Sequence, residues 1–258
     1  MRLTFLGTGT SFGVPQIGCA CAVCRSPDPR DRRTRVGALI ETDAGARILI
    51  DTPPELRLQL VAARVDRIDA VLYTHDHADH THGIDDLRAF SVRAKAPITL
   101  YGSAATVDAL ARKFFYIFDQ SVPLPPGTDR PEVRARALAE RETVSIAGVD
   151  VTPVHVPHGY SDVFGYRLGD LAYVTDAKCV PPEALDRLRG ARVLVVNALF
   201  RTPHPTHLSI PEALDVVAAV GAERAYLTHL THRYSHAELE AELPPHVRPA
   251  YDGLVVEV

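Results

Sequence analysis

The 258-residue chain contains no apolar run that approaches the ~20 residues of a membrane-spanning helix. Its amino terminus, MRLTFLGTGT, lacks the long apolar stretch and the small-residue cleavage site of a signal peptide. Charge of one sign is not in large excess, because 28 Lys and Arg stand against 32 Asp and Glu, a formal net charge of −4. We therefore expect a cytoplasmic protein with no membrane partner and no extended nucleic-acid surface.

Cysteine is scarce, and its placement is unlike that of a disulfide framework. Cys19, Cys21 and Cys24 lie within six positions, and Cys179 stands alone. Such crowding is typical of a metal site, whereas we expect Cys179 to be a small buried side chain. A hydrophobic fraction of 46 % is ordinary for a globular protein and, at this length, favours one α/β domain over residues 1–258.

Short strands and helices mix along the whole chain. Runs rich in β-branched residues predict strands at Arg2–Leu6, Ala38–Thr42, Arg47–Ile50, Ala70–Tyr73, Ile98–Tyr101, Val149–Val154, Phe164–Leu168, Leu171–Val174, Arg192–Val196, Arg224–Leu227 and Leu254–Val258. Apolar residues at helical spacing predict helices at Pro54–Ala63, Asp85–Ala94, Ser103–Phe115, Pro181–Leu188 and Ile210–Val220. This mixture favours a mixed sheet system covered by helices over one parallel sheet.

Local signals mark several ends and turns of these elements. Ser103 and Ser209 are candidate helix N-caps, and Glu212 would complete a capping box with Ser209. The turn sequences DAG at 43–45 and LGD at 168–170 predict antiparallel hairpins. The proline-rich segment Ser121–Arg136 predicts a loop or lid.

The most specific pattern is the string VLYTHDHADHTHG at residues 71–83. It places His75, His77, Asp79 and His80 directly after an apolar run, so we expect them on the loop that leaves a buried strand. Imidazoles and carboxylates are the usual ligands of zinc and similar ions. His75 and His77 can converge on one ion in extended backbone, and Asp79 and His80 can turn toward a second.

A binuclear site needs more ligands than one loop supplies, and three later segments offer them. His155 and His158 come late in one strand-like run, Asp176 follows another, and His229 ends a third. Polar ligands at the ends of several strands on one sheet edge form a typical active-site layout. Each residue taken alone is more often a core or surface residue than a ligand.

Taken together, these motifs resemble those of the metallo-β-lactamase superfamily. The matching residues are GTGTS near the start, Asp51 after a strand, THDHADH, His158 with GY at 165–166, Asp176, and His229 in THLTH. They occur in the order of the family's five motifs and cover nearly the whole chain. The resemblance implies an α/β fold, the four-layer αββα sandwich, with a dinuclear site on one edge.

The same resemblance implies which residues bind the two divalent ions, zinc or manganese. One ion would be held by His75, His77 and His158, and the other by Asp79, His80 and His229, with Asp176 bridging them. Asp79 is also expected to take part in catalysis. Asp51 is normally not a ligand and would support the histidine loop.

Within the superfamily the chain resembles the PhnP-like cyclic phosphodiesterases, on the segment GVPQIGCACAVC at residues 13–24. In that branch a C-x-C-x-x-C cluster binds a structural zinc, with a His three positions after the last active-site His. The pattern here gives Cys19, Cys21, Cys24 and His232. Three cysteines and one histidine make the closed tetrahedral set expected of structural zinc. Because His229 and His232 share a loop, this zinc is expected to brace the catalytic loop.

The implied reaction is hydrolysis of a small phosphodiester or nucleotide by a hydroxide that bridges the two ions. His207, just before a helix, is the expected proton donor to the leaving group, with His204 as the alternative. His236 and His246 are expected to be exposed. A homodimer is possible, since phosphodiesterases of this type are often dimers.

Other chemistries remain open on the same fold. They are RNase Z-like tRNA processing, disfavoured because no long Gly-rich and basic arm is visible, thiolester or lactam hydrolysis, a PqqB-like role in cofactor biosynthesis, a redox iron protein and a metal-binding module without turnover. Metal analysis with a chromogenic phosphodiester assay would separate these possibilities.

Overall fold

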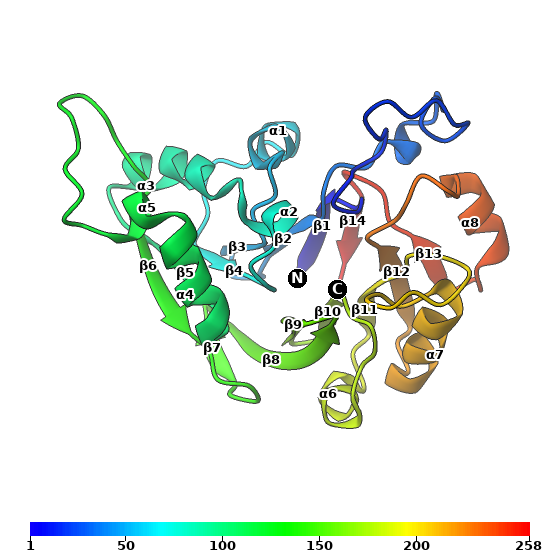
Figure 1. Cartoon of the computed structure of the whole chain (residues 1–258). Coiled ribbons are helices and arrows are strands. Elements are labelled where there is room, and N and C mark those ends of the chain that lie inside the picture. Colours follow the sequence, from blue (N-terminus) through cyan, green and yellow to red (C-terminus); the bar gives the residue numbers. More distant parts are fainter.

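Two seven-stranded sheets stack face to face, with helices on both outer sides, in a computed structural model that describes all 258 residues (Figure 1). The first sheet runs in the order β14 (Val255–Glu257), β1 (Arg2–Gly7), β2 (Gly37–Glu41), β3 (Arg47–Ile50), β4 (Ala70–Leu72), β5 (Ile98–Gly102) and β6 (Val133–Ala137). The second runs in the order β13 (Val247–Pro249), β12 (Arg224–Thr228), β11 (Val193–Asn197), β10 (Leu171–Val174), β9 (Ser161–Leu168), β8 (Val149–His158) and β7 (Val144–Ile146).

The helices divide between the two outer faces. Over the first sheet lie α1 (Leu56–Ala62), α3 (Arg88–Ala94), α4 (Ala104–Lys113) and α5 (Phe115–Phe118), with the short α2 (Ala78–Thr81) in the histidine loop. Over the second lie α6 (Pro182–Leu188), α7 (Ile210–Val220) and α8 (His236–Glu242). Single 3₁₀ turns occur at Pro29–Asp31 and Ile84–Leu87. This arrangement is the predicted four-layer αββα sandwich.

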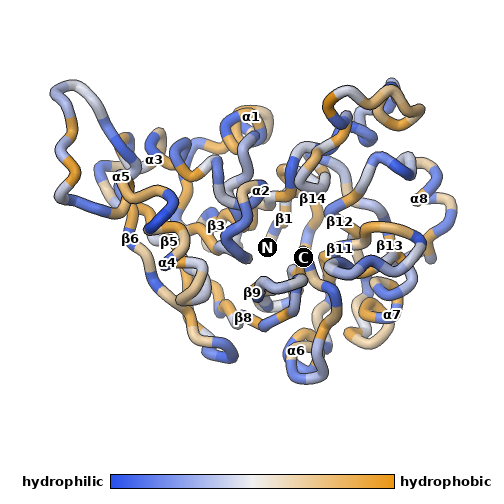
Figure 2. Tube along the Cα trace, viewed as in Figure 1, coloured by the Kyte–Doolittle hydropathy of each residue, from blue (hydrophilic) through white to orange (hydrophobic).

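Period-two alternation along the strands builds three apolar layers. In β3, Ile48 and Ile50 face the other sheet, while Leu49 faces the helices. In β11, Val193 likewise faces the first sheet, while Leu194 faces the outer helices. Successive side chains of a strand point to opposite faces, so a strand buried on both sides must be apolar throughout. Figure 2 shows this apolar character along the strands of both sheets.

Strand direction gathers the ends of the ligand-bearing strands at one edge. In the first sheet β3 and β4 are parallel, so Asp51 and the loop at 73–77 leave the same edge. In the second sheet β10, β11 and β12 are parallel, and β8 shares their direction because each of β8 and β10 pairs antiparallel with β9. The chain therefore brings His158, Asp176 and His229 to one edge of the second sheet.

Hydrogen bonds join the two sheets close to this edge. The Phe164 N–H donates to the Thr74 carbonyl at 2.9 Å, and the Tyr166 hydroxyl donates to the Tyr73 carbonyl at 2.6 Å. The strand ends of the two sheets are thereby held against each other.

Most predicted elements are confirmed, with shifts of a few residues at their ends. Helix α7 has the predicted bounds and the predicted Ser209–Glu212 capping box, and Ser103 caps α4. The turns at 43–45 and 168–170 join antiparallel strands as predicted.

Several predictions need correction. The segment Ser121–Arg136 is not irregular throughout, because its last residues enter β6 and pair with β5. The short strands β7 and β13 and helix α8 were not predicted. His236 is buried at 2 % exposure, where an exposed position was expected, because its N–H donates to the buried Asp31 carboxylate at 2.7 Å. Cys179 is exposed, not buried, since it lies in the loop between β10 and α6.

No helix of the structure has the length and apolar character needed to cross a membrane.

Candidate metal centre

The loops that leave the paired sheet edges bring together a compact cluster of imidazoles and carboxylates. Neighbouring groups, each with its ligand atoms within 4.8 Å of one another, are His75, His77 and His158; His75, His80 and Asp176; Asp79, His80 and His229; and His158, Asp176 and His207. Every residue predicted to hold the two active-site ions is in one of these groups. The groups share members, so the cluster is continuous.

The first group, His75, His77 and His158, presents ring nitrogens to a common point. The Nδ1 atoms of two of these rings are engaged from behind: His75 lies 3.0 Å from the Thr74 hydroxyl, and His158 donates to the Thr206 carbonyl at 2.9 Å. The Nε2 of His75 is buried without any hydrogen-bond partner. A buried polar atom without a partner is costly, and metal ligation would satisfy this nitrogen.

Asp176 joins this group to the second one. One of its carboxylate oxygens, Oδ1, lies 3.1 Å from His229 Nε2 and 4.0 Å from His158 Nε2, and the other, Oδ2, lies 3.3 Å from His80 Nε2. The second group is completed by Asp79, whose carboxylate lies 3.4 Å from His80 Nε2. One carboxylate that faces both groups of donors is the arrangement that a bridging ligand requires.

The protonation of the cluster suits metal ligation. Burial lowers the pKa of His75 well below its usual value and lowers that of His229 to about 4. Burial also opposes the charge of Asp176, but the neighbouring imidazoles His229 and His80 hold its pKa well below the usual range. Neutral imidazoles and ionised carboxylates are the forms that bind metals.

His80 is the exception among the histidines. Burial works against its protonation, yet Asp176, Asp51 and Asp79 together raise its pKa well above the usual value. The cluster thus concentrates negative charge around one imidazole. A cation bound there would take the place of the His80 proton.

Asp51 supports His80 from outside the cluster. Its side chain is completely buried, and its Oδ2 lies 2.7 Å from His80 Nδ1. The same carboxylate accepts hydrogen bonds from the Thr74 N–H and hydroxyl, both at 2.8 Å. This carboxylate–histidine pair fixes the ring so that Nε2 points into the cluster, as the second sphere of a metal site does.

Left-handed backbone is concentrated at this edge. Asp51, Asp176 and His229 have φ values of 64°, 56° and 56°, although none is a glycine. A non-glycine residue in this region costs on the order of 1 kcal/mol or more and persists where the surroundings demand it. Each follows the end of a strand directly or within two residues, so the sharp turn there sends the side chain back to the edge.

His207 lies beside the cluster and His204 behind it. His207 Nε2 is 3.1 Å from Asp176 Oδ1, and its Nδ1 is 2.8 Å from the Thr206 hydroxyl. The nearest nitrogen of His204, Nδ1, is 3.4 Å from His207 Nδ1, and no contact of His204 with a carboxylate of the cluster occurs. Of the two candidate proton donors, His207 is therefore the one that contacts a carboxylate of the cluster.

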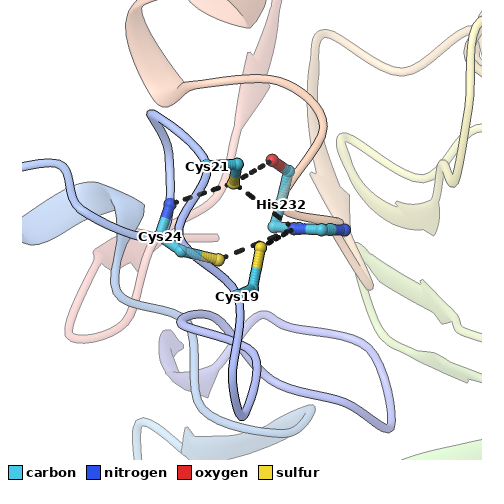
Figure 3. A group of neighbouring side chains, drawn as sticks. All are labelled: Cys19, Cys21, Cys24 and His232. Carbon is cyan, nitrogen blue, oxygen red and sulfur yellow. Dashed lines mark hydrogen bonds between the residues drawn. The ribbon is translucent and has the colours of Figure 1, made fainter.

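The three clustered cysteines converge on His232, as Figure 3 shows. Their sulfurs lie 3.3 Å (Cys19), 3.5 Å (Cys21) and 3.6 Å (Cys24) from His232 Nδ1. Zinc–sulfur and zinc–nitrogen bonds of about 2.3 and 2.0 Å at a tetrahedral angle put sulfur and nitrogen about 3.5 Å apart. The donor set therefore fits a zinc ion in both chemistry and size.

The thiols lie so close together that their ionised forms would repel one another unless a cation were bound between them. The Cys24 N–H donates to the Cys21 sulfur and lowers the pKa of Cys21 to about 6. Burial and the two neighbouring sulfurs raise the pKa of Cys24 to about 11. Thiolates this close together need a positive charge between them, as in a structural zinc site.

A buried arginine joins the segment that follows the clustered cysteines to the loop that carries His229 and His232. The guanidinium of Arg33, whose side chain has no exposed surface, donates to the carbonyls of Thr231 and, at 3.2 Å, Tyr234. It also pairs with Asp31 at 3.1 Å. The two candidate metal sites therefore share a fixed loop.

Comparison with known proteins agrees with this geometry. The family described as Beta-lactamase superfamily domain matches residues 46–230. A solved structure described as a new diphosphatase from the PhnP family has a TM-score of 0.90 and 38% identity, covering 100% of this chain and 97% of the other. Zn²⁺-bound PqqB from Methylobacterium extorquens has a TM-score of 0.80 at 20% identity, with complete coverage of both chains, a likeness of fold.

A curated relative from Porphyromonas gingivalis, named Octanoyltransferase, is 40% identical over 259 residues. The match covers 98% of this chain but 51% of that relative, so the chain spans about half the length of the relative.

The chain belongs to the β-lactamase superfamily, and its fold is that of the metallo-β-lactamases. Within that class it is a PhnP-like protein. Divalent-metal binding follows from the family.

Proposed function

We propose that this protein is a dinuclear metal-dependent phosphodiesterase that hydrolyses small phosphodiesters, cyclic sugar phosphates or nucleotides. The observation that carries the proposal is the position of Asp176, with one oxygen toward His80 and the other toward His158 and His229. A relative of the same fold that acts as a diphosphatase supports phosphoryl chemistry at such a site.

The ligands of the two ions follow from the groups described above. His75, His77 and His158 would hold one ion, Asp79, His80 and His229 the other, and Asp176 both. When bound, such a pair of ions lowers the pKa of water to near neutrality and neutralises charge on phosphoryl oxygens. A third ion, zinc, would be held by the Cys₃His group, away from the chemistry.

His207 is the residue proposed to supply the proton that the leaving alkoxide needs. Hydrolysis forms one P–O bond to water and breaks the P–O bond to the alkoxide, which becomes an alcohol only when a proton reaches it. His207 Nε2 lies 3.1 Å from Asp176 Oδ1, so this nitrogen of the ring faces the cluster. The Thr206 hydroxyl holds the other ring nitrogen and so sets the orientation of the ring.

The test is turnover by the zinc- or manganese-loaded protein of a panel of substrates. The panel contains bis(p-nitrophenyl) phosphate, 2′,3′-cyclic nucleotides, cyclic ribose phosphates, a thiolester, a β-lactam and precursor tRNA. We expect hydrolysis of the small phosphodiesters, loss of that activity after chelation, and recovery when the metal returns. Asp176→Asn should abolish it, while Cys179→Ser, a change at an exposed residue outside both metal groups, should not.

Other outcomes of the same panel would reject the proposal. Turnover of precursor tRNA, the thiolester or the lactam in place of small phosphodiesters would show that the protein catalyses one of the other reactions known for this fold. Iron content with oxygen consumption and no ester hydrolysis would support a redox protein. Bound metal with no turnover of any substrate would support a metal-binding module.

A further inference from the structure

The strongly exposed aromatic side chains of this protein belong to segments that adjoin the loops of the candidate metal centre. They are Phe12, Phe115 and Tyr160, with 69%, 59% and 112% of their surface exposed. Single apolar residues on a surface are ordinary. The informative feature is that each of these three lies in a segment that contacts the metal-binding loops, so we call them the aromatic rim.

Tyr160 lies at the tip of the turn that joins β8 to β9. The turn is flanked by His158, a candidate ligand, and its pairing partner Ser161, whose hydroxyl lies 3.4 Å from His77 Nε2. Gly159 has a φ of 60°, and a Cβ there would come within 3.0 Å of the Thr206 side chain. The turn is therefore packed against the site on one side, while the Tyr160 ring extends into solvent.

Phe115 begins helix α5 next to the histidine loop. The residue before it, Phe114, packs its ring against His82 with centroids 5.4 Å apart. Lys113, one residue earlier, donates its ammonium to the carboxylate of Asp76 at 2.6 Å. Asp76 lies between the candidate ligands His75 and His77, so this segment borders the metal loop.

Phe12 follows the GTGTS segment on the His229 side of the centre. The Leu230 N–H, next to His229, donates to the Thr8 carbonyl at 2.8 Å, and Gly9 bridges to Leu230. The segments of the three rim residues therefore adjoin three different parts of the centre: Tyr160 is next to His158, Phe115 is next to the histidine loop, and Phe12 is on the side of His229.

We propose that the aromatic rim binds the base of a nucleotide substrate, with Tyr160 as the main stacking surface. This inference rests on the proposed phosphodiesterase function and narrows its substrate class from phosphodiesters in general to those that carry a nucleobase. In the proposed function, the ions of the metal cluster bind the phosphoryl oxygens, and His207 protonates the leaving group. The aromatic side chains of the rim, outside the metal cluster, would stack on the planar nucleobase, whichever base it is.

The experiment compares two substrates that differ only in the base, 2′,3′-cyclic AMP and the 2,3-cyclic phosphate of methyl riboside. In the metal-loaded protein, Tyr160→Ala should raise KM for 2′,3′-cyclic AMP about tenfold, within the range of base–aromatic stacking. It should leave kcat for that substrate, and both constants for the base-free one, within about twofold. Tyr160→Phe keeps the ring and should behave as the wild type, as should Val255→Ala, an exposed residue of β14 that is distant along the chain from all three rim residues.

A binding measurement separates this inference from the proposed function. We expect calorimetry to show that the metal-loaded protein binds 5′-AMP about tenfold more tightly than ribose 5-phosphate, and that Tyr160→Ala removes the difference. Base preference without turnover of either cyclic substrate would reject the phosphodiesterase and keep the base site. Equal binding of the two ligands, or equal loss for both in Tyr160→Ala, would overturn the inference.

Discussion

Asp51 is a residue that supports the candidate metal site without being one of its predicted ligands. It has no place among the donors, yet it fixes the Nδ1 side of His80 and the backbone of Thr74 at once. Its left-handed φ of 64° is tolerated because asparagine and aspartate visit that region more readily than bulky residues do.

The first prediction concerns that carboxylate. Asp51→Asn keeps the size and the tolerance of left-handed backbone but removes the charge that holds His80. We expect the affinity for the active-site ions to fall about 10- to 100-fold, the usual effect of losing such a partner. Competition with a chromogenic chelator measures this. Affinity equal to that of the wild type would show that the Asp51–His80 contact does not orient the ring.

The second prediction concerns His207. His207→Ala should lower kcat for an alkyl phosphodiester by about 10²- to 10⁴-fold, the usual contribution of a general acid. The loss should be much smaller for bis(p-nitrophenyl) phosphate, whose leaving group needs no proton. Metal content should stay at the wild-type value, and His204→Ala is the matched control. An equal loss for both substrates, or loss of metal, would make His207 a ligand instead of a proton donor.

At the scale of elements, the loop between β12 and α8 carries residues of both metal groups. His229 and His232 are three positions apart, and Arg33 holds the carbonyls of Thr231 and Tyr234 on either side of His232. The Cys₃His group is therefore connected to His229 through only two residues, Leu230 and Thr231, and both are buried.

The third prediction tests this link. Cys19→Ser removes one sulfur from the Cys₃His group, so the structural zinc should be lost and the affinity for the active-site ions should fall about tenfold, at the lower end of the effect of second-sphere changes. Cys179→Ser is the control, because that thiol is exposed and belongs to neither metal group. Normal active-site occupancy in Cys19→Ser would separate the two sites.

The elements that the sequence predicts well are those with a complete local signal. The strands β3, β10 and β11 are apolar apart from Arg47 and Asn197 at their ends, because both faces of these strands are buried, and α7 carries its own capping box and an apolar stripe. Strands β7 and β13 have three residues each with a polar residue, Ser145 or Arg248, at the centre, so neither shows the apolar run that marks the equally short β4.

The histidines likewise divide into those whose positions the sequence predicts and those whose positions it does not. The residues predicted as metal ligands lie together in the structure, and they could be selected because their spacing and their positions after strands repeat a known pattern. The burial of His236 could not, because it depends on Asp31, 205 residues away in the chain. The aromatic rim also escaped prediction, since Phe12, Phe115 and Tyr160 share no sequence motif and meet only through the contacts of their neighbours.

At the scale of the whole molecule, the candidate centre joins the two sheets. Asp51 and the histidine loop come from the first sheet, while His158, Asp176 and His229 come from the second. Ions seated between them would cross-link the sandwich at this edge. That the chain forms one domain over residues 1–258 stays a prediction.

The fourth prediction follows from that cross-link. Ligands that bind only the folded state stabilise it by about 4 kcal/mol when free ion exceeds Kd a thousandfold. In a protein of this size, about 2–4 °C of Tm accompanies each kcal/mol. Chelation should therefore lower Tm by about 10 °C, and zinc should restore it. A Tm that does not respond to chelation or to added zinc would argue against ions between the sheets.

The central claim is that residues distant in the chain seat two ions around Asp176, and anomalous diffraction at the zinc edge from crystals of the zinc-loaded protein tests it most directly. We predict three peaks: one among His75, His77 and His158, one among Asp79, His80 and His229, and one among the cysteines and His232. A map with no density beside Asp176, or with His158 and His229 turned away from the 75–80 loop, would contradict the account.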